Sequence, residues 1–404
     1  MSELINNREY RQKALKELIL QLHSGKTVQE VKKNFEELTK GISASEIAEM
    51  EQSLISEGMP VEEIQRLCDV HAAVFKGSIE DIHKSEKIVT QGDHPIQIMK
   101  EENETIQRII DERVEANIEA FREIDDIYVL EDLLEDFNDL WELDKHYARK
   151  ENLLFPYLEK YGITAPPKVM WGVDDEIRKG IKEVKKMMLE YQGEKDELIC
   201  KIKETIYKIT EMIFKEENIL FPMAVDSLTE SEWENISRES EAFGYTLTNP
   251  KGIWKASNDI HYADNTPDYS DDGEISFDAG VLSALETNAI FNTLPLDITF
   301  VDKEGKVKYF SQGKERIFAR PKTILGREVK NCHPPSSVHV VEQIVEDLKS
   351  GKKEYADFWI RMGEKLVYIR YFAVRNKGEY LGVLEITQDI QPIQEITGEK
   401  RLMD

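Results

Sequence analysis

The sequence predicts a multidomain protein, in which an all-α N-terminal module and a four-helix bundle precede a C-terminal α+β domain. Apolar residues recur at helical spacing up to about residue 247 and alternate after residue 276. The segment KENLLFP (150–156) is nearly repeated as EENILFP (216–222), and each copy ends a long helical pattern. A repeated acidic helix end favours a bundle that directs carboxylates inward.

The N-terminal module covers residues 1–87 and is predicted to consist of short helices. Leu15, Leu18 and Leu22 recur at helical spacing, and Gly41 marks a helix end before a new start.

The bundle covers residues 92–247. A first helix is predicted to begin at Asp93, a second to cover 128–158, a third to begin at Asp174 and a fourth to cover 195–220. Long helices in direct succession fit an up-down-up-down bundle. The Phe-Pro pair of each repeat is predicted to end its helix.

Residues 248–276 are rich in turn-forming dipeptides and are predicted to be a linker. The α+β domain then covers residues 277–396. Its pattern predicts two strands joined by a turn, a helix and a further set of strands, at 297–301, 306–310, 337–348, 355–362, 366–374 and 380–389.

Composition excludes several classes of protein. The 404 residues carry a formal net charge of -26, which argues against non-specific binding to nucleic acid or to an anionic membrane. No apolar run reaches the length of a membrane span, and the N-terminus is too charged for a signal peptide. The three cysteines are widely separated and form no disulfide framework. We therefore expect a cytoplasmic protein.

Residues 94–223 resemble hemerythrin-like, cation-binding bundles. That family places a histidine early in the first helix, a His-x-x-x-Glu in the second, a histidine in the third and another His-x-x-x-Glu in the fourth. His94 and His146 match the first two histidines, and Glu216 matches the last glutamate. The resemblance implies a non-haem iron centre, and imidazole and carboxylate groups one turn apart suit iron.

The chain departs from the family pattern at the remaining positions. Lys150 stands where the second helix should carry a carboxylate, Asp174 replaces the third histidine and Met212 replaces the fourth. An oxygen-carrying site with four or five histidines is therefore excluded. We expect a carboxylate-rich centre that holds one or two iron ions weakly, with Lys150 supplying a positive charge in place of a second iron. The predicted metal ligands are His94, His146, Glu151, Asp174, Glu216 and Glu217.

The same residues also fit a bundle that has lost most of its metal site. In this alternative Asp174 is a helix N-cap, the Phe-Pro pairs only end helices, and the glutamates are solvated.

The whole chain resembles a bacterial family that combines a helical domain of unknown function, a hemerythrin-like domain and a PAS domain. The segments LCDVHAAVF (67–75), VMWGVDDE (169–176) and NCHPP (331–335) carry this resemblance. PAS domains bind small molecules or haem, or dimerise and relay a signal. Cys332 and His333 are the candidate cofactor-binding residues for an unidentified PAS ligand, although adjacent residues rarely point at one ion.

The chain has no nucleotide-binding glycine loop and no G-x-S-x-G motif. The resemblance therefore favours a metal-binding sensor or regulatory protein that responds to oxygen, nitric oxide or redox state and acts through an unknown partner protein. A homodimer is expected. The alternatives are a di-metal oxidoreductase, which would turn over its oxidant, and an iron storage or delivery protein, which would release its metal.

Overall fold

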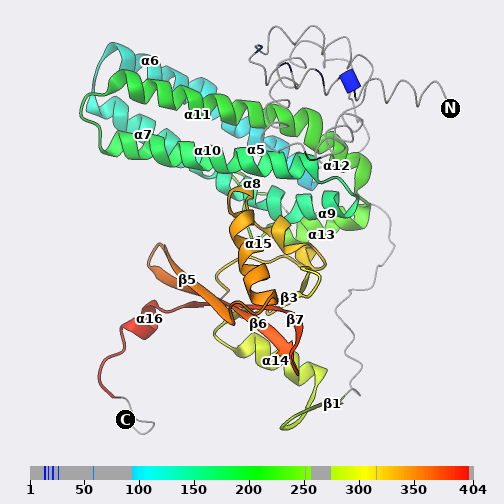
Figure 1. Ribbon diagram of the computed structural model, residues 1–404. Helices are drawn as coiled ribbons and strands as arrows, with labels where there is room; N and C mark the ends of the chain where they lie inside the picture. Colours follow the sequence, from blue (N-terminus) through cyan, green and yellow to red (C-terminus); the bar gives the residue numbers. More distant parts are fainter. Residues whose placement is uncertain are drawn as a thin grey trace, which may run out of the picture. The chain divides into compact units, whose positions relative to one another are not determined.

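The computed structural model describes residues 93–250, 252–255, 274–314 and 316–399, together with Lys13, Ala14, Glu17, Gln21, Lys26 and Gly58 (Figure 1). The N-terminal module predicted for residues 1–87 lies outside these residues, apart from the six single positions. The chain divides into two units, Met1–Ala256 and Ser257–Asp404. The fold-class prediction is confirmed for the described residues, because a helical region is followed by a sheet-rich C-terminal domain.

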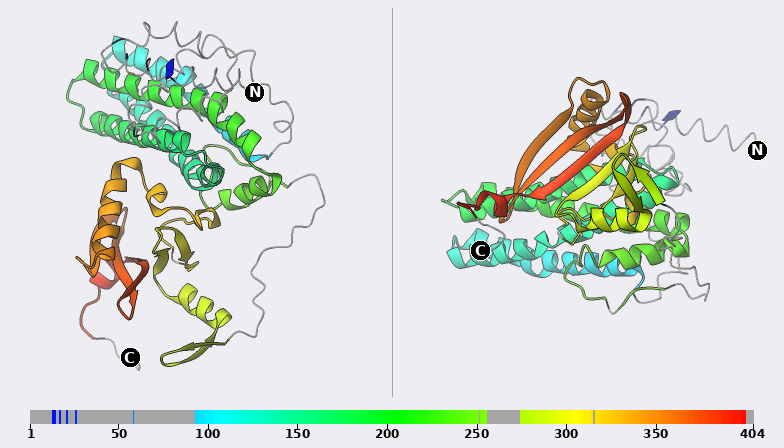
Figure 2. Two further views of the ribbon diagram at one scale, coloured as in Figure 1. Left: turned by 45° about the vertical axis from the view of Figure 1, so that its right-hand side comes forward. Right: turned by 90° about the horizontal axis from the view of Figure 1, so that it is seen from below.

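The described part of the first unit is a bundle of four rods, each a succession of helices, followed by a short helix. The rods lie side by side in every view (Figures 1 and 2). The first rod is α5 (Pro95–Ile109), η2 (Ile110–Val114) and α6 (Glu115–Glu123), and the second is α7 (Ile127–Trp141), α8 (Leu143–Arg149), η3 (Lys150–Leu154) and α9 (Phe155–Lys160). The third is α10 (Ala165–Leu189), the fourth is α11 (Lys195–Lys215), η4 (Glu216–Leu220) and α12 (Phe221–Ser227), and α13 (Glu230–Ser240) follows.

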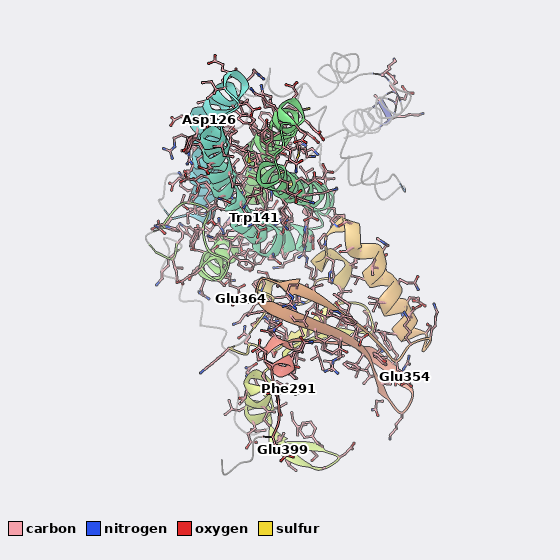
Figure 3. All side chains as sticks on the ribbon, turned by 90° about the vertical axis from the view of Figure 1, so that its left-hand side faces the viewer. Asp126, Trp141, Phe291, Glu354, Glu364 and Glu399 are labelled. Atoms are coloured by element: carbon pink, nitrogen blue, oxygen red, sulfur yellow. The ribbon has the colours of Figure 1, made fainter. Side chains whose placement is uncertain are left out.

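The first and third rods begin at residues other than those predicted, because a local cap or prolines set the start of each helix. His94 is the N-cap of α5, because its side chain accepts a hydrogen bond from the backbone N–H of Ile96. The third rod begins at Ala165, well before Asp174, because prolines fit the first turn of a helix. Asp126 caps α7 as expected for an aspartate, and Trp141 marks the other end of that helix (Figure 3).

The predicted helix ends at the two Phe-Pro pairs are wrong, because both helices continue through them. A π turn precedes each pair, and the N–H of Phe155 bonds to the carbonyl of Lys150, while that of Phe221 bonds to the carbonyl of Glu216. The wider turn accommodates the following proline, which has no N–H to donate.

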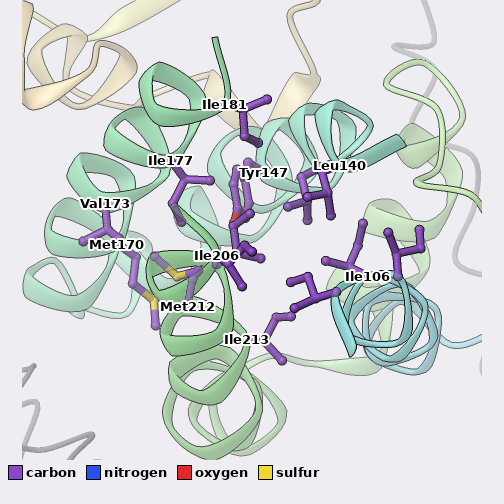
Figure 4. Packing of buried hydrophobic residues seen from close by; sticks show 14 of the residues in the cluster. Ile106, Leu140, Tyr147, Met170, Val173, Ile177, Ile181, Ile206, Met212 and Ile213 are labelled. Atoms are coloured by element: carbon purple, nitrogen blue, oxygen red, sulfur yellow. The ribbon is translucent and has the colours of Figure 1, made fainter. Parts of the chain in front are cut away.

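The bundle core is a continuous apolar cluster to which every rod contributes. Figure 4 shows Ile106, Leu140 and Met212 directed into the space between the rods, with Tyr147 among them. No helix of the described residues is long and apolar enough to cross a membrane.

The C-terminal unit contains an antiparallel sheet in the order β4-β3-β7-β6-β5 and a separate hairpin of β1 and β2. The strands are β1 (Glu274–Phe277), β2 (Gly280–Ser283), β3 (Asp297–Asp302), β4 (Val307–Phe310), β5 (Tyr355–Met362), β6 (Lys365–Asn376) and β7 (Glu379–Asp389). The helices are α14 (Ala284–Thr293), η5 (Lys322–Ile324), η6 (Val329–Cys332), α15 (Pro335–Lys349) and α16 (Gln391–Gln394). Leu348 of α15 packs with Val301 and Val383 of the sheet.

Gly180 allows α10 and α11 to approach closely. A Cβ atom at this position would lie 2.9 Å from Thr205 Oγ1, which belongs to a stiff β-branched side chain. The third and fourth rods carry Asp174 and Glu216, so this contact helps to set the distance between those acids.

We predict that Gly180→Ala lowers the free energy of unfolding in the wild-type background and raises it in a Thr205→Ala background. The overlap should cost about 1–3 kcal/mol, whereas alanine in a helix otherwise gains about 0.5–1 kcal/mol over glycine. Denaturant unfolding followed by circular dichroism measures both effects. Equal effects in the two backgrounds would show that the contact does not limit the approach of the helices.

Candidate functional site

The ammonium of Lys150 lies at the centre of the bundle and is fully buried. Its Nζ donates to Asp174 Oδ1 at 2.9 Å and to Glu216 Oε1, and it lies 4.4 Å from the centre of the Tyr147 ring. Burial opposes the charge, but Asp174 and Glu216 outweigh it and raise the pKa of Lys150. The side chain is therefore a buried cation between two carboxylates.

The repeated sequence motif explains how two of these groups are placed. Lys150 and Glu216 are the first residues of their π turns, and they occupy the same position of the repeat. Asn152 donates its side-chain amide to the carbonyl of Ala148 at 2.8 Å, and Asn218 makes the corresponding bond to Phe214 at 2.8 Å. The asparagines thus satisfy carbonyls where the helical hydrogen bonding changes. The motif builds a local widening that presents its first side chain to the bundle centre.

Glu216 joins the second and fourth rods to the first. Its Oε2 accepts from Asn103 Nδ2 at 3.0 Å and lies 3.1 Å from His146 Nε2. Burial raises the pKa of Glu216, but Lys150 and His146 outweigh that effect and lower it to about 2. Glu216 is therefore ionised.

His146 lies between two carboxylates. Its Nδ1 is 2.8 Å from Glu102 Oε2, on the opposite side of the ring from Glu216. Burial lowers the pKa of His146, but Glu216 and Glu102 outweigh it and raise the value. Glu102 also accepts from Arg149 and, at 2.7 Å, from the backbone N–H of Thr246.

This cluster contains three basic and three acidic side chains. The basic groups are Lys150, Arg149 and His146, and the acidic groups are Glu102, Asp174 and Glu216. We call these six residues the charged centre. Burial raises the pKa of Asp174 to about 6, and the attraction of Lys150 opposes that rise.

A second ion pair flanks the charged centre. Arg178 holds Glu151 through two hydrogen bonds of 2.7 and 3.0 Å and also donates to Asp144 at 2.7 Å. Bidentate pairing with a guanidinium occupies both oxygens of Glu151. Glu151 therefore faces Arg178.

His94 and Glu217 are not members of the charged centre. The His94 ring is 4.9 Å from the rings of both Trp233 and Trp254, and its Nδ1 accepts from the Ile96 N–H at 3.2 Å. Burial lowers the pKa of His94 to about 4, so the ring is neutral. Glu217 is half-buried, and burial raises its pKa.

The structure thus brings together three of the six predicted ligands, His146, Asp174 and Glu216, around Lys150. Ligation of a metal by any of the six stays a prediction. The alternative that Asp174 is an N-cap is wrong, because Asp174 lies buried inside α10.

Sequence reasoning missed Glu102 and Arg149. Ile98, Glu102 and Ile106 are spaced four residues apart and are all buried on one face of α5. A charged residue within such an apolar stripe is a sequence signal for a buried ion pair.

The charged centre does not fit a di-metal site in this arrangement. Within the described ranges, no group of three or more His, Cys, Asp or Glu side chains is placed to hold a metal ion. The ammonium of Lys150 lies between the two acids that a metal would need.

The C-terminal unit has its own buried charges. Arg320 donates to Glu385 at 2.8 Å, and Glu385 pairs across the sheet with Tyr371. Burial lowers the pKa of the adjacent His333, whose charged neighbours include Glu385 and Arg320. Cys332 Sγ donates to the carbonyl of Glu328 at 3.7 Å. A cofactor-binding role of Cys332 and His333 stays a prediction.

Family models match three segments in order. Residues 15–81 match a family of unknown function, DUF438, residues 94–224 match the hemerythrin HHE cation binding domain, and residues 287–391 match a PAS domain. No curated protein sequence matches the chain.

Similar solved structures cover about a quarter to a third of the chain. A C-terminal domain from Streptococcus mutans is 37% identical and covers 30% of this chain and 96% of its own, with a TM-score of 0.29. A PAS domain from Colwellia psychrerythraea is 16% identical and covers 27% of this chain and 98% of its own, with a TM-score of 0.22. A sensory box sensor histidine kinase from Vibrio cholerae is 10% identical and covers 26% of this chain and 90% of its own, with a TM-score of 0.21.

We predict that Glu216→Gln and Glu217→Gln differ strongly in their effect on the free energy of unfolding. Glu216→Gln removes one partner of a buried ion pair, which should cost about 3–5 kcal/mol. Glu217→Gln changes a half-buried residue outside the charged centre and should cost less than about 1 kcal/mol. Thermal and denaturant unfolding measure both. Similar losses for the two variants would contradict the assignment of Glu216 to the charged centre.

Proposed function

We propose that this chain, which combines a DUF438 segment, a hemerythrin HHE domain and a PAS domain in the predicted order, is a cytoplasmic sensor-type regulatory protein. The HHE and PAS domains support a metal-binding sensor-type protein. In this chain the charged centre is the part of the bundle in which basic side chains contact buried carboxylates. The proposal includes an unknown partner protein that receives the signal, and a homodimer.

The observation that carries the proposal is that the charged centre joins all four rods of the bundle. Glu102 belongs to α5, His146 and Lys150 to the second rod, Asp174 to α10 and Glu216 to η4. Buried networks of this kind respond as a unit, because an unpaired buried charge is costly. A change of one charge at this point therefore favours a different packing of the rods, which is a property suited to a switch.

The PAS domain is the second part of the proposed sensor. Arg320, Glu385, Tyr371 and His333 form a partly buried polar and charged group beside its sheet. Polar groups that converge in this way suit a small polar ligand better than an apolar one. We propose that Cys332 and His333 belong to that ligand site.

Iron-dependent sensing of oxygen, nitric oxide or redox state is the second candidate. Its supporting observation is the contact of His146 Nδ1 with Glu102, since a carboxylate at this position commonly orients a histidine that ligates a metal through its other nitrogen. The pairing of Lys150 with Asp174 and Glu216 opposes this candidate, and no step of the main proposal depends on a metal.

We predict that the wild-type protein, supplied with Fe²⁺, does not consume oxygen, hydrogen peroxide or nitric oxide beyond one equivalent per chain. A sensor binds its signal stoichiometrically, whereas an oxidoreductase turns it over. Oxygen and nitric oxide electrodes and a peroxide assay measure consumption, with iron in buffer as the control. Sustained turnover would overturn the sensor proposal in favour of an oxidoreductase.

Elemental analysis after anaerobic purification separates the two sensor candidates. Iron near one ion per chain that is lost in His94→Ala/His146→Ala, but kept in the control His339→Ala, would favour iron-dependent sensing. Iron that leaves freely to a chelator would favour storage or delivery. Wild-type protein without bound metal would oppose iron-dependent sensing and leave the charged centre itself as the sensing element.

A further inference from the structure

We propose that Lys150 occupies the place of a divalent cation in this bundle, and that removing its ammonium opens a site that binds such an ion. The inference concerns the charged centre alone and does not depend on the sensor proposal.

The first argument is the chemistry of the atoms around the ammonium. Lys150 Nζ contacts one oxygen of Asp174 and one oxygen of Glu216. The other oxygen of Asp174 is buried and has no hydrogen-bond partner, and the other oxygen of Glu216 lies 3.1 Å from His146 Nε2. Two carboxylates with an adjacent imidazole form a set of ligands that manganese, iron and zinc accept.

The second argument comes from the repeat within the chain. Lys150 in KENLLFP occupies the position of Glu216 in EENILFP, and both side chains reach the charged centre from equivalent π turns. A glutamate at both positions would place two carboxylates together beside Asp174, and such a group needs an external cation. The lysine supplies that positive charge from within the chain.

The third argument is burial. Lys150, Asp174 and Glu216 have essentially no exposed side-chain surface, so water cannot solvate the acids if the ammonium is removed. Unpaired buried carboxylates will take up another cation or destabilise the bundle. A divalent ion fits this requirement because it interacts with both acids at once.

The test compares Mn²⁺ binding by wild-type protein and by Lys150→Met, which removes the charge and is one atom shorter, so that it vacates the position of the ammonium. We expect Lys150→Met to bind about one Mn²⁺ per chain at least about tenfold more tightly than the wild type does, a difference of about 1.4 kcal/mol. Calorimetry and the electron paramagnetic resonance signal of Mn²⁺ measure binding. The bound ion should also raise the melting temperature of the variant and not that of the wild type.

Lys208→Met is the matched control. Lys208 also contacts two carboxylates, Glu176 at 3.0 Å and Glu204 at 3.5 Å, but on the bundle surface. Water solvates these acids, so removal of Lys208 should leave Mn²⁺ affinity unchanged. Lys150→Met/Glu216→Gln should lose the Mn²⁺ binding gained by Lys150→Met.

A second variant, Lys150→Gln, keeps a hydrogen-bond donor and covers the case in which Lys150→Met folds only with metal. Failure of both variants to bind Mn²⁺, or failure of Mn²⁺ to restore folding where it is lost, would overturn the inference. Wild-type protein that binds Mn²⁺ as tightly as Lys150→Met, through Glu216, would also overturn it. None of these results depends on oxidant turnover by the wild type, so the two proposals can fail separately.

Discussion

The contacts of Lys150 with Asp174 and Glu216 fix the geometry of the bundle centre. A buried ammonium is tolerated only when carboxylates approach it closely, so these contacts constrain the second, third and fourth rods together. Glu216 extends the constraint to the first rod through Asn103. The proposed switch behaviour and the inferred cation site both depend on this pairing of Lys150 with the two acids.

The two π turns are the local structures that place Lys150 and Glu216 at the bundle centre. Each copy of the repeat combines a proline with an asparagine, and the helix widens before the proline without ending. This widening places the first residue of each copy toward the bundle axis. The two copies therefore provide equivalent positions, and their different side chains, lysine and glutamate, form an ion pair there.

The two units bury charge in different ways. The bundle surrounds Lys150 with acids from several helices, whereas the C-terminal unit pairs Arg320 with Glu385 against one face of its sheet. Both arrangements exchange solvation for specific partners, a cost that proteins commonly accept at functional positions. The buried charges of each unit are therefore the groups through which the proposed sensor responds.

The periodicity of apolar residues determined the helical bundle and the sheet-rich domain, because burial of one face follows directly from spacing along the chain. The sequence also predicted His146, Asp174 and Glu216 as members of one site, with a positive charge from Lys150 beside them. Only the tertiary structure decided that Glu151 faces Arg178, that His94 lies between two tryptophans, and that Glu102 and Arg149 complete the charged centre. Those partners are distant in sequence, and their contacts depend on how the rods turn and widen in three dimensions. Side-chain direction after a π turn cannot be read from helical spacing alone.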